Sequence, residues 1–146
     1  MSDLVDSAER QILNLLYRYA EYVDDGDFDG VAGLFEHADY HMADRVGQRG
    51  EAVGARLRTS VITYEGKPRT KHVTTNAIID VLTDGTATCR SYFTVLQATD
   101  TMHLQPIITG RYHDRFEVAD GAWRFADRAI IIEQVGDLSQ HLRRRE

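Results

Sequence analysis

The stretch YAEYVDDGDFDGVAGLF, residues 19–35, holds four aspartates within six positions, at the junction of two helical patterns. Gly26 ends the first pattern, because glycine readily takes the left-handed conformation that closes a helix. Asp27 is well placed to cap a second, short helix, in which every third or fourth residue from Phe28 is apolar. The stretch therefore predicts two helices joined by a tight turn.

Upstream of this junction, apolar residues recur with the spacing of one helical face. They are Ile12, Leu15, Leu16, Tyr19, Ala20 and Val23. Asp6 and Glu9 resemble a capping box, with aspartate in place of the usual serine or threonine. This pattern predicts a first helix that starts after Asp6 and ends at Gly26.

Downstream, the chain changes from helical to strand patterns. A short strand is predicted at Asp39–Met42 and a third helix at Glu51–Ser60. Four longer segments, rich in β-branched and aromatic residues, follow at 70–82, 86–98, 104–118 and 123–135. Asp-Gly pairs stand at two of the junctions between these segments, and such pairs are typical of hairpin turns. The order of elements predicts one α+β domain, residues 1–146, in which a curved antiparallel sheet wraps around two or three N-terminal helices.

The charge balance excludes some classes of partner. The chain has 17 lysine and arginine residues against 23 aspartate and glutamate residues, a net charge of −6, which argues against nucleic acid. The one basic cluster, residues 141–145, is interpreted as a solvated tail. The acidic amino terminus lacks a signal-peptide pattern, and no apolar run approaches the roughly 20 residues of a membrane span. We therefore expect a cytoplasmic protein that binds neither nucleic acid nor membrane.

Sequence motifs for metals and cofactors are missing. The six histidines lack the spacing of HExxH or of a zinc finger, and the single cysteine, Cys89, lies in a strand pattern that favours a buried structural thiol. No P-loop, GxGxxG or GxSxG pattern occurs. We predict no metal and no cofactor.

Position along the first helix separates the four aspartates. Asp24 follows Leu16 and Ala20 at intervals of four residues, which places it on the buried face, whereas Asp25 lies about 100° further round and points outward. Asp24 is therefore a candidate site residue, with a local turn or cap as the alternative. Tyr19 lies one turn earlier on the same face and is either a site residue or a core tyrosine.

Strand alternation supplies further candidates. Along the first long strand the even-numbered residues, among them His72, Thr74 and Asn76, share one face, which either lines a pocket or faces solvent. In the stretch GRYHDRF, residues 110–116, Tyr112 lies on the face opposite the basic residues. Tyr112 is expected either in the same pocket or in the core.

Together these features resemble the SnoaL-like family of the nuclear transport factor 2 superfamily. The resemblance rests on the pattern YxxxxDxxDFD at the end of the first helix, on a histidine in the first long strand, and on the stretches GRYHDRF and DGAWRFADR. It spans almost the whole chain and implies a cystatin-like cone. Relatives include scytalone dehydratase, bile acid 7α-dehydratase and the small subunits of ring-hydroxylating dioxygenases, so the fold leaves the substrate open.

The resemblance also implies site residues. In the dehydratases of this group a tyrosine, an aspartate five residues later and a histidine on the first long strand form the catalytic core, and Tyr19, Asp24 and His72 stand at these places. The strand CRSYFTVLQAT lacks the second active-site histidine of scytalone dehydratase, which argues against that substrate. Some relatives use an arginine on the late strands, for which Arg128 and Arg111 are candidates.

The resulting hypothesis is a cofactor-independent dehydratase or isomerase that acts on a hydrophobic polycyclic, steroid-like or aromatic compound. Asp24 orients His72, which removes a proton next to a carbonyl, while Tyr19 donates a hydrogen bond to the developing oxygen. The alternatives are a non-catalytic small subunit of a dioxygenase-like assembly and a small-molecule-binding module. In every case we expect self-association, as a dimer or a trimer, through the outer face of the sheet.

Overall fold

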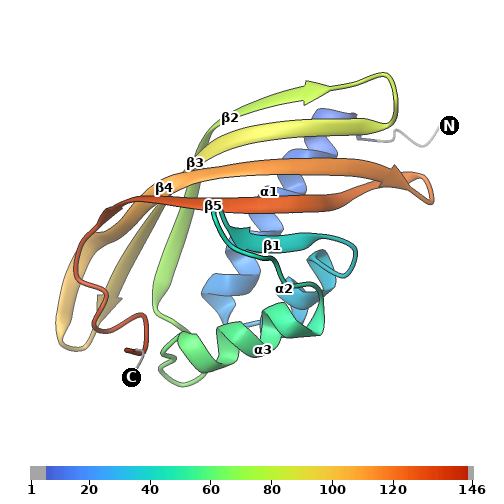
Figure 1. Ribbon diagram of the computed structural model, residues 1–146. Coiled ribbons are helices and arrows are strands. Elements are labelled where there is room, and N and C mark those ends of the chain that lie inside the picture. The colour runs from blue at the N-terminus through green and yellow to red at the C-terminus, as the bar shows by residue number, and fades with distance from the viewer. Residues whose placement is uncertain (1–5, 145–146) are drawn as a thin grey trace, which may run out of the picture.

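The chain forms three helices and one five-stranded sheet, in the order that the sequence predicts (Figure 1). The computed structural model describes residues 6–144. The helices are α1 (Ala8–Asp25), α2 (Phe28–Leu34) and α3 (Glu51–Ser60). The strands are β1 (Asp39–Met42), β2 (Thr70–Val81), β3 (Thr86–Thr99), β4 (Met102–Ala119) and β5 (Ala122–Val135).

The two ends of α1 differ in how well they were predicted. Ser7, not Asp6, is the N-cap: its hydroxyl accepts a hydrogen bond from the backbone nitrogen of Arg10 at 3.2 Å. The helix cap therefore lies one residue later than predicted, and the predicted capping box of Asp6 and Glu9 is wrong. Gly26 ends the helix as predicted, with a φ of 72°. A Cβ at Gly26 would lie 2.0 Å from the carbonyl oxygen of Gly66, so glycine also allows the turn before β2 to pack against the end of α1.

The second helix confirms the predicted cap. The Asp27 carboxylate accepts a hydrogen bond from the backbone nitrogen of Gly30 at 2.8 Å. This short helix reverses the chain directly after α1, as the aspartate-rich junction predicts. Its apolar side, with Phe28 and Val31, is buried.

The sheet has the strand order β1-β5-β4-β3-β2. The four long strands form the predicted antiparallel meander, and the turns at Gly85 and Gly121 carry φ angles of 81° and 79°. The sheet is mixed rather than wholly antiparallel, because β1 pairs in parallel with β5. This edge pairing was not predicted; it covers backbone groups of β5 that would otherwise be unpaired.

A β-bulge divides β2 and overturns part of the predicted alternation. The register with β3 shifts between Thr75 and Ile78, and Asn76 takes a positive φ of 55°. Before the bulge the even-numbered residues face the helices; after it Ala77 packs against the core and Ile78 is exposed. The predicted face is therefore right at His72 and wrong at Asn76, because one extra residue reverses every later side chain.

A second register shift lies in β5. Phe116 of β4 pairs with Phe125, whereas Arg115 pairs with Asp127, so one residue of β5 is extra. This irregularity allows both Phe125 and Arg128 to point to the inner face, although their positions differ by an odd number. Both side chains are fully buried.

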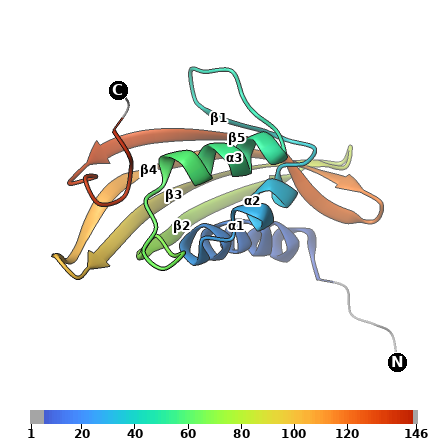
Figure 2. The same cartoon turned by 90° about the horizontal axis from the view of Figure 1, so that it is seen from below.

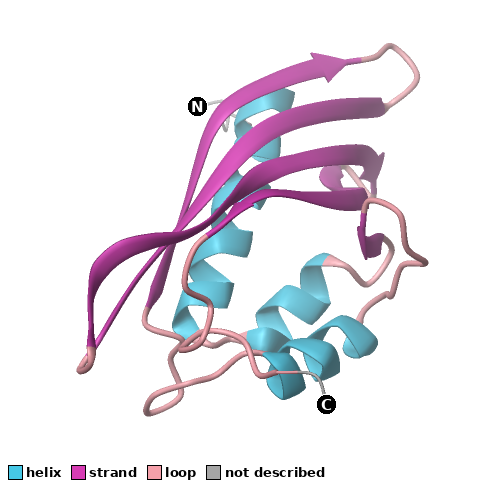
Figure 3. Cartoon of the chain, turned by 60° about the vertical axis from the view of Figure 1, so that its left-hand side comes forward, coloured by secondary structure: helices cyan, strands magenta, loops and turns pink. Residues whose placement is uncertain are grey.

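All three helices lie on one face of the sheet (Figure 2), and the strands bend over them (Figure 3). The core forms where the inner face of the sheet meets the apolar face of α1. The predicted burial of Cys89 is confirmed. After β5 the chain returns to the end of α3, where the backbone nitrogen of Ile62 donates to the carbonyl oxygen of His141 at 2.8 Å. Within residues 6–144, every helix is too short or too polar to span a lipid bilayer.

Candidate functional site

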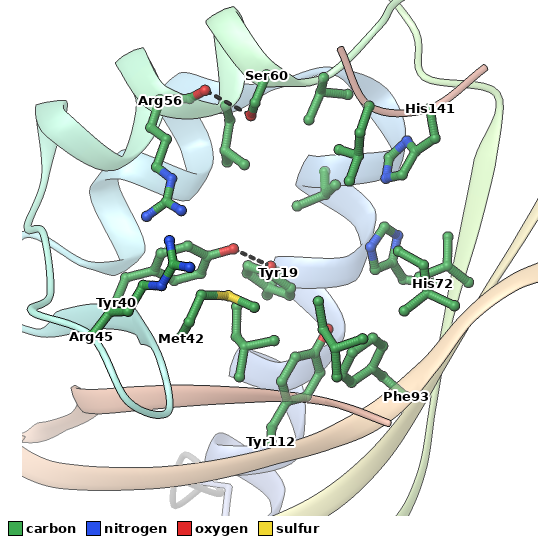
Figure 4. Close-up of a pocket in the computed structure, with 18 of the residues that line it drawn as sticks. Tyr19, Tyr40, Met42, Arg45, Arg56, Ser60, His72, Phe93, Tyr112 and His141 are labelled. Carbon is green, nitrogen blue, oxygen red and sulfur yellow. Dashed lines mark hydrogen bonds between the residues drawn. The ribbon is translucent and has the colours of Figure 1, made fainter. Parts of the chain in front are cut away.

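A cavity of about 450 Å³ lies between the inner face of the sheet, α1, α3 and the C-terminal segment (Figure 4). Its apolar wall includes Val23, Phe93, Val95, Ile108, Tyr112, Ile130 and Ile132. Polar side chains gather at two opposite ends of the cavity: His72 and His141 at one, Arg45 and Arg56 at the other. The cavity is therefore mainly apolar, with a few polar groups in defined places, as is usual for small-molecule sites.

Asp24 and His72 form a hydrogen-bonded pair at the edge of this cavity. Asp24 lies in the last turn of α1, and its Oδ1 is 2.6 Å from His72 Nδ1. The same carboxylate accepts hydrogen bonds from the Thr70 hydroxyl and from the His72 backbone nitrogen, both at 2.8 Å. The two side chains are only 10% and 9% exposed. Three donors from the start of β2 thus hold the carboxylate in place.

This arrangement fixes how the imidazole of His72 is presented. A carboxylate accepts but cannot donate, so Nδ1 carries the proton in the hydrogen bond to Asp24. In the neutral form of this imidazole the lone pair is on Nε2, and Nε2 makes no hydrogen bond to any part of the chain within residues 6–144. Since His72 lines the cavity, this nitrogen is available to a bound molecule. The chemistry that such a pair can perform is proton abstraction by Nε2.

Tyr19 and Tyr40 share a hydrogen bond between the two polar ends. Their hydroxyl oxygens are 2.8 Å apart, and both side chains line the cavity (Figure 4). The ring of Tyr19 meets the imidazole of His72 edge to face, with 6.4 Å between ring centroids. Burial raises the pKa of both hydroxyls well above the ordinary value for tyrosine, so they remain protonated donors at neutral pH.

Sequence reasoning missed Tyr40. It stands in the four-residue strand β1, whose place beside β5 depends on a pairing between residues far apart in the chain. One local signal was present: Tyr40 and Met42 alternate with polar neighbours, and both line the cavity.

Arg128 lies beneath the tyrosines rather than in the cavity wall. Its Nε and Nη2 donate to the two carboxylate oxygens of Asp114 at 2.8 and 2.9 Å, and both side chains are 0% exposed. The guanidinium carbon is 3.7 Å from the ring centroid of Tyr112 and 4.4 Å from that of Tyr19. The Asp114–Arg128 pair therefore packs behind the rings of Tyr19 and Tyr112.

The other predicted binding residues are distributed over different surfaces. Tyr112 is buried, lines the cavity, and stacks on Phe93 with 4.4 Å between ring centroids. Thr74 is half-buried but does not line the cavity, and Asn76 is exposed at the bulge on the outer face. Arg111 is also on the outer face, where it pairs with Glu133.

His141 corrects the interpretation of the C-terminal segment as a solvated tail. The residue is 4% exposed, its side chain lines the cavity, and its Nδ1 has no hydrogen-bond partner within residues 6–144. Burial, with a further contribution from nearby His72, lowers the pKa of His141 to about 4, so this imidazole is neutral at pH 7. No local pattern marks a histidine at the start of a basic run as buried.

Side chains that could hold a metal do not converge in the part of the chain that the structure describes. Within residues 6–144 there is no group of three or more His, Cys, Asp or Glu side chains in a suitable arrangement. His41, for example, lies next to Asp127 and the carbonyl oxygen of Met42 instead.

Comparison with protein families gives a match over most of the chain. Residues 7–129 match the SnoaL-like domain family. Comparison of the sequence with curated proteins finds no match.

Solved structures share the fold, and three examples come from Novosphingobium aromaticivorans. A scytalone dehydratase candidate is 24% identical, with a TM-score of 0.70 over 88% of this chain and 86% of the other. A nuclear transport factor 2-like protein with a cystatin-like fold is 20% identical, with a TM-score of 0.70 over 85% and 80%. The β subunit of a candidate aromatic-ring-hydroxylating dioxygenase is 16% identical, with a TM-score of 0.69 over 92% and 95%. These similarities confirm the expected fold.

Proposed function

This chain belongs to the SnoaL-like domain family, and on that premise we propose that it is a cofactor-independent lyase or isomerase acting on a hydrophobic polycyclic, steroid-like or aromatic substrate. One observation carries the proposal: the Asp24–His72 pair leaves one imidazole nitrogen open to an apolar cavity. A buried structural histidine usually has both ring nitrogens hydrogen-bonded, to the protein or to ordered water.

In this mechanism His72 is the general base. Its Nε2 takes a proton from a carbon next to a carbonyl group, and Asp24 stabilises the imidazolium that forms. The same proton then leaves His72, either to a departing hydroxyl, which releases water, or to another carbon of the substrate, which gives an isomer. A base placed in this way contributes about 10² to 10⁴ in rate.

The tyrosine pair is suited to bind the developing oxygen. Tyr19 and Tyr40 have two hydroxyl hydrogens, and the hydrogen bond between them uses one. The second can be donated to an enolate oxygen, in a site where little water competes. Arg128, stacked behind Tyr19, adds positive charge below the same point and favours negative charge there.

His141 is a second polar group at the base end of the cavity. As a neutral imidazole it can donate one hydrogen bond and accept another, and its Nδ1 lacks a partner in the described chain. We assign it the task of binding the hydroxyl that departs in a dehydration, beside His72.

The cavity wall supports this choice of substrate class. The stacked rings of Phe93 and Tyr112 form a flat side, and the aliphatic side chains of Val95 and Ile108 lie in the same wall. A volume of about 450 Å³ is within the range of small-molecule pockets, roughly 300 to 1,000 Å³. A flat, mostly apolar ring system suits this space.

The open cavity also bears on the alternatives. A small subunit that only supports a partner chain has no need of an open cavity, and here the space is open. A binding module remains the second candidate, because it would use the same cavity without proton transfer. Self-association as a dimer or trimer stays a prediction; Tyr92 and Ile78 are exposed on the outer face of the sheet.

The test measures which nitrogen of His72 carries the proton. We expect nitrogen-15 NMR at pH 7 to show a proton on Nδ1 in the native protein, and a change towards the other tautomer in Asp24→Asn, because an amide cannot replace the carboxylate as a pure acceptor. Asp25→Asn, the neighbouring aspartate that points outward, is the matched control and should change nothing.

The same variants separate an enzyme from a binding module. In a screen of hydroxy-ketones and steroid-like enones, turnover by the native protein should fall by about 10² to 10⁴ in Asp24→Asn. A proton on Nε2 in the native protein, or turnover that is insensitive to Asp24→Asn, contradicts the proposed mechanism.

A further inference from the structure

We infer that the cavity binds a substrate carrying a carboxylate, which Arg45 and Arg56 hold at the end away from His72; this inference rests on the proposed function and specifies its substrate. Arg45 lies in the loop after β1, and Arg56 lies on α3. Both side chains line the cavity and extend into the same end of it, near Tyr40 (Figure 4).

The charge of the cavity wall is opposite to that of the chain. The protein has a net charge of −6, yet the lining includes three arginines, Arg45, Arg56 and Arg143, against the single carboxylate of Asp44. An arginine-rich cavity in an acidic protein attracts anions locally and repels them elsewhere. The wall therefore selects for negative charge in its ligand.

Neighbouring arginines show what is unusual about this group. Arg49 pairs with Asp39, and Arg58, two residues after Arg56 on the same helix, pairs with Asp29. Arg45, Arg56 and Arg143 form no ion pair with any carboxylate within residues 6–144. On α3, one arginine is thus neutralised outside the cavity, and the other brings an uncompensated charge into it.

Two guanidinium groups directed into one space repel each other, and an anion between them reverses the sign of that interaction. Arg56 is half-buried, which weakens competition from water at its guanidinium, whereas Arg45 is exposed. It also lies close enough to Tyr40 to act on the ionisation of its hydroxyl, which places its charge next to the tyrosine pair. A planar guanidinium matches a carboxylate through two parallel hydrogen bonds.

The positions of the arginines and of His72 would orient a bound substrate. A carboxylate at the arginine end fixes one end of an apolar ring system, whose other end then lies at His72. The same anchor removes rotational freedom of the substrate before proton transfer, which is a recognised source of rate.

The test compares two probes of nearly the same shape, anthracene-2-carboxylate and anthracene-2-carboxamide, by fluorescence titration. We expect the native protein to bind the carboxylate more tightly. In the double variant Arg45→Gln/Arg56→Gln the dissociation constant of the carboxylate should rise by about 10-fold to 100-fold, and that of the carboxamide should not change. Arg58→Gln is the matched control on the same helix and should bind both probes as the native protein does.

Three outcomes overturn the inference: equal binding of the two probes, no binding of either, or the same loss in Arg58→Gln as in the double variant. Tighter binding of 2-anthryl phosphate than of the carboxylate overturns the choice of carboxylate. Circular dichroism and thermal unfolding of each variant establish that it is folded. Because probe binding needs no proton transfer, the inference can fail while the His72 tautomer experiment succeeds, and the reverse.

Discussion

Two buried pairs, each of an aspartate and a basic side chain, lie on either side of Tyr19. They differ in whether the protein encloses the basic side chain completely. Asp114 and Arg128 are completely buried, joined by two hydrogen bonds and covered by aromatic rings. Asp24 and His72 are nearly as well buried, but the imidazole lines the cavity and keeps one nitrogen free of protein partners in the described chain. The carboxylate is held firmly in both; only the base partner of Asp24 can reach a ligand.

The difference gives the two pairs different expected roles: one stabilises the structure, and the other can exchange a proton with a ligand. A closed ion pair cannot exchange protons with a substrate, but it holds the surrounding rings in position and places a fixed dipole beneath them. The open pair can exchange a proton because His72 lines the cavity and its second nitrogen has no protein partner in the described chain. Tyr19 contacts both pairs, through Arg128 on one side and the ring of His72 on the other. Damage to the closed pair should therefore appear first as lost stability, and damage to the open pair as lost turnover in the proposed reaction.

The largest effect on stability is expected from breaking the closed pair. Arg128→Met leaves the Asp114 carboxylate buried without a counter-charge and should lower the free energy of unfolding by about 3–5 kcal/mol. The double variant Arg128→Met/Asp114→Leu removes both charges and should recover part of that loss. Urea denaturation at pH 7 measures all three proteins.

Arg111→Met is the control for this comparison, because Arg111 pairs with Glu133 on the outer face and is partly exposed. A surface pair contributes about 0–1 kcal/mol, so this variant should remain close to the native protein. A double variant as unstable as Arg128→Met, or an Arg128→Met protein as stable as Arg111→Met, would show that charge compensation is not what the closed pair provides.

A smaller effect is expected from protonation at the open site. Burial first, and His72 second, lower the pKa of His141 from 6.5 to about 4. Between these values the unfolded chain binds a proton at this residue and the folded chain does not, so the free energy of unfolding falls as the pH falls. The loss from this residue reaches at most about 3 kcal/mol.

Denaturation of the native protein and of His141→Gln at pH 7 and pH 4.5 measures this contribution. The native protein should lose more stability than the variant between the two pH values, since groups remote from His141 titrate equally in both. If the two proteins lose the same amount, His141 is accessible to protons in the folded state and the histidine end of the cavity is wetter than its burial indicates.

The smallest effect on the free energy of unfolding is expected from Asp24→Asn. The amide replaces one oxygen with a donor, so at least one of the three groups that donate to Asp24 loses its acceptor, at about 1–3 kcal/mol. Asp25→Asn should stay within about 0.5 kcal/mol of the native protein, because Asp25 is exposed. Equal stability of the two variants would mean that the carboxylate network adds nothing to folding.

Much of the fold followed from local patterns. The apolar rows of α1, the glycine that ends it, the Asp27 cap and the Asp-Gly turns each involve residues within a few positions of one another. Asp24 was recognised as inward-facing for the same reason, since its position depends only on the helical repeat. His72 was placed correctly because it precedes the bulge in β2.

The errors have physical causes that no local pattern reveals. Asn76 left the predicted face because asparagine tolerates the left-handed conformation that the bulge requires, and one extra residue reversed the alternation. His141 is buried because backbone hydrogen bonds tie its segment to the chain after α3, about 80 residues earlier. Tyr40 reaches the cavity through a parallel pairing with β5.

The sequence by itself determined the helices, the long strands, their turns and one inward-facing carboxylate, because each depends on periodicities of a few residues. Tertiary structure alone decided which side chains share the cavity: Tyr40 with Tyr19, His141 with His72, and Arg45 with Arg56. Such meetings depend on bulges, edge pairing and the return of the C-terminal segment, whose energies arise from contacts between residues distant in sequence. The Asp24–His72 pair needed both, since the helical repeat aims the carboxylate and packing of the turn at Gly26 against Gly66 brings β2 within its reach.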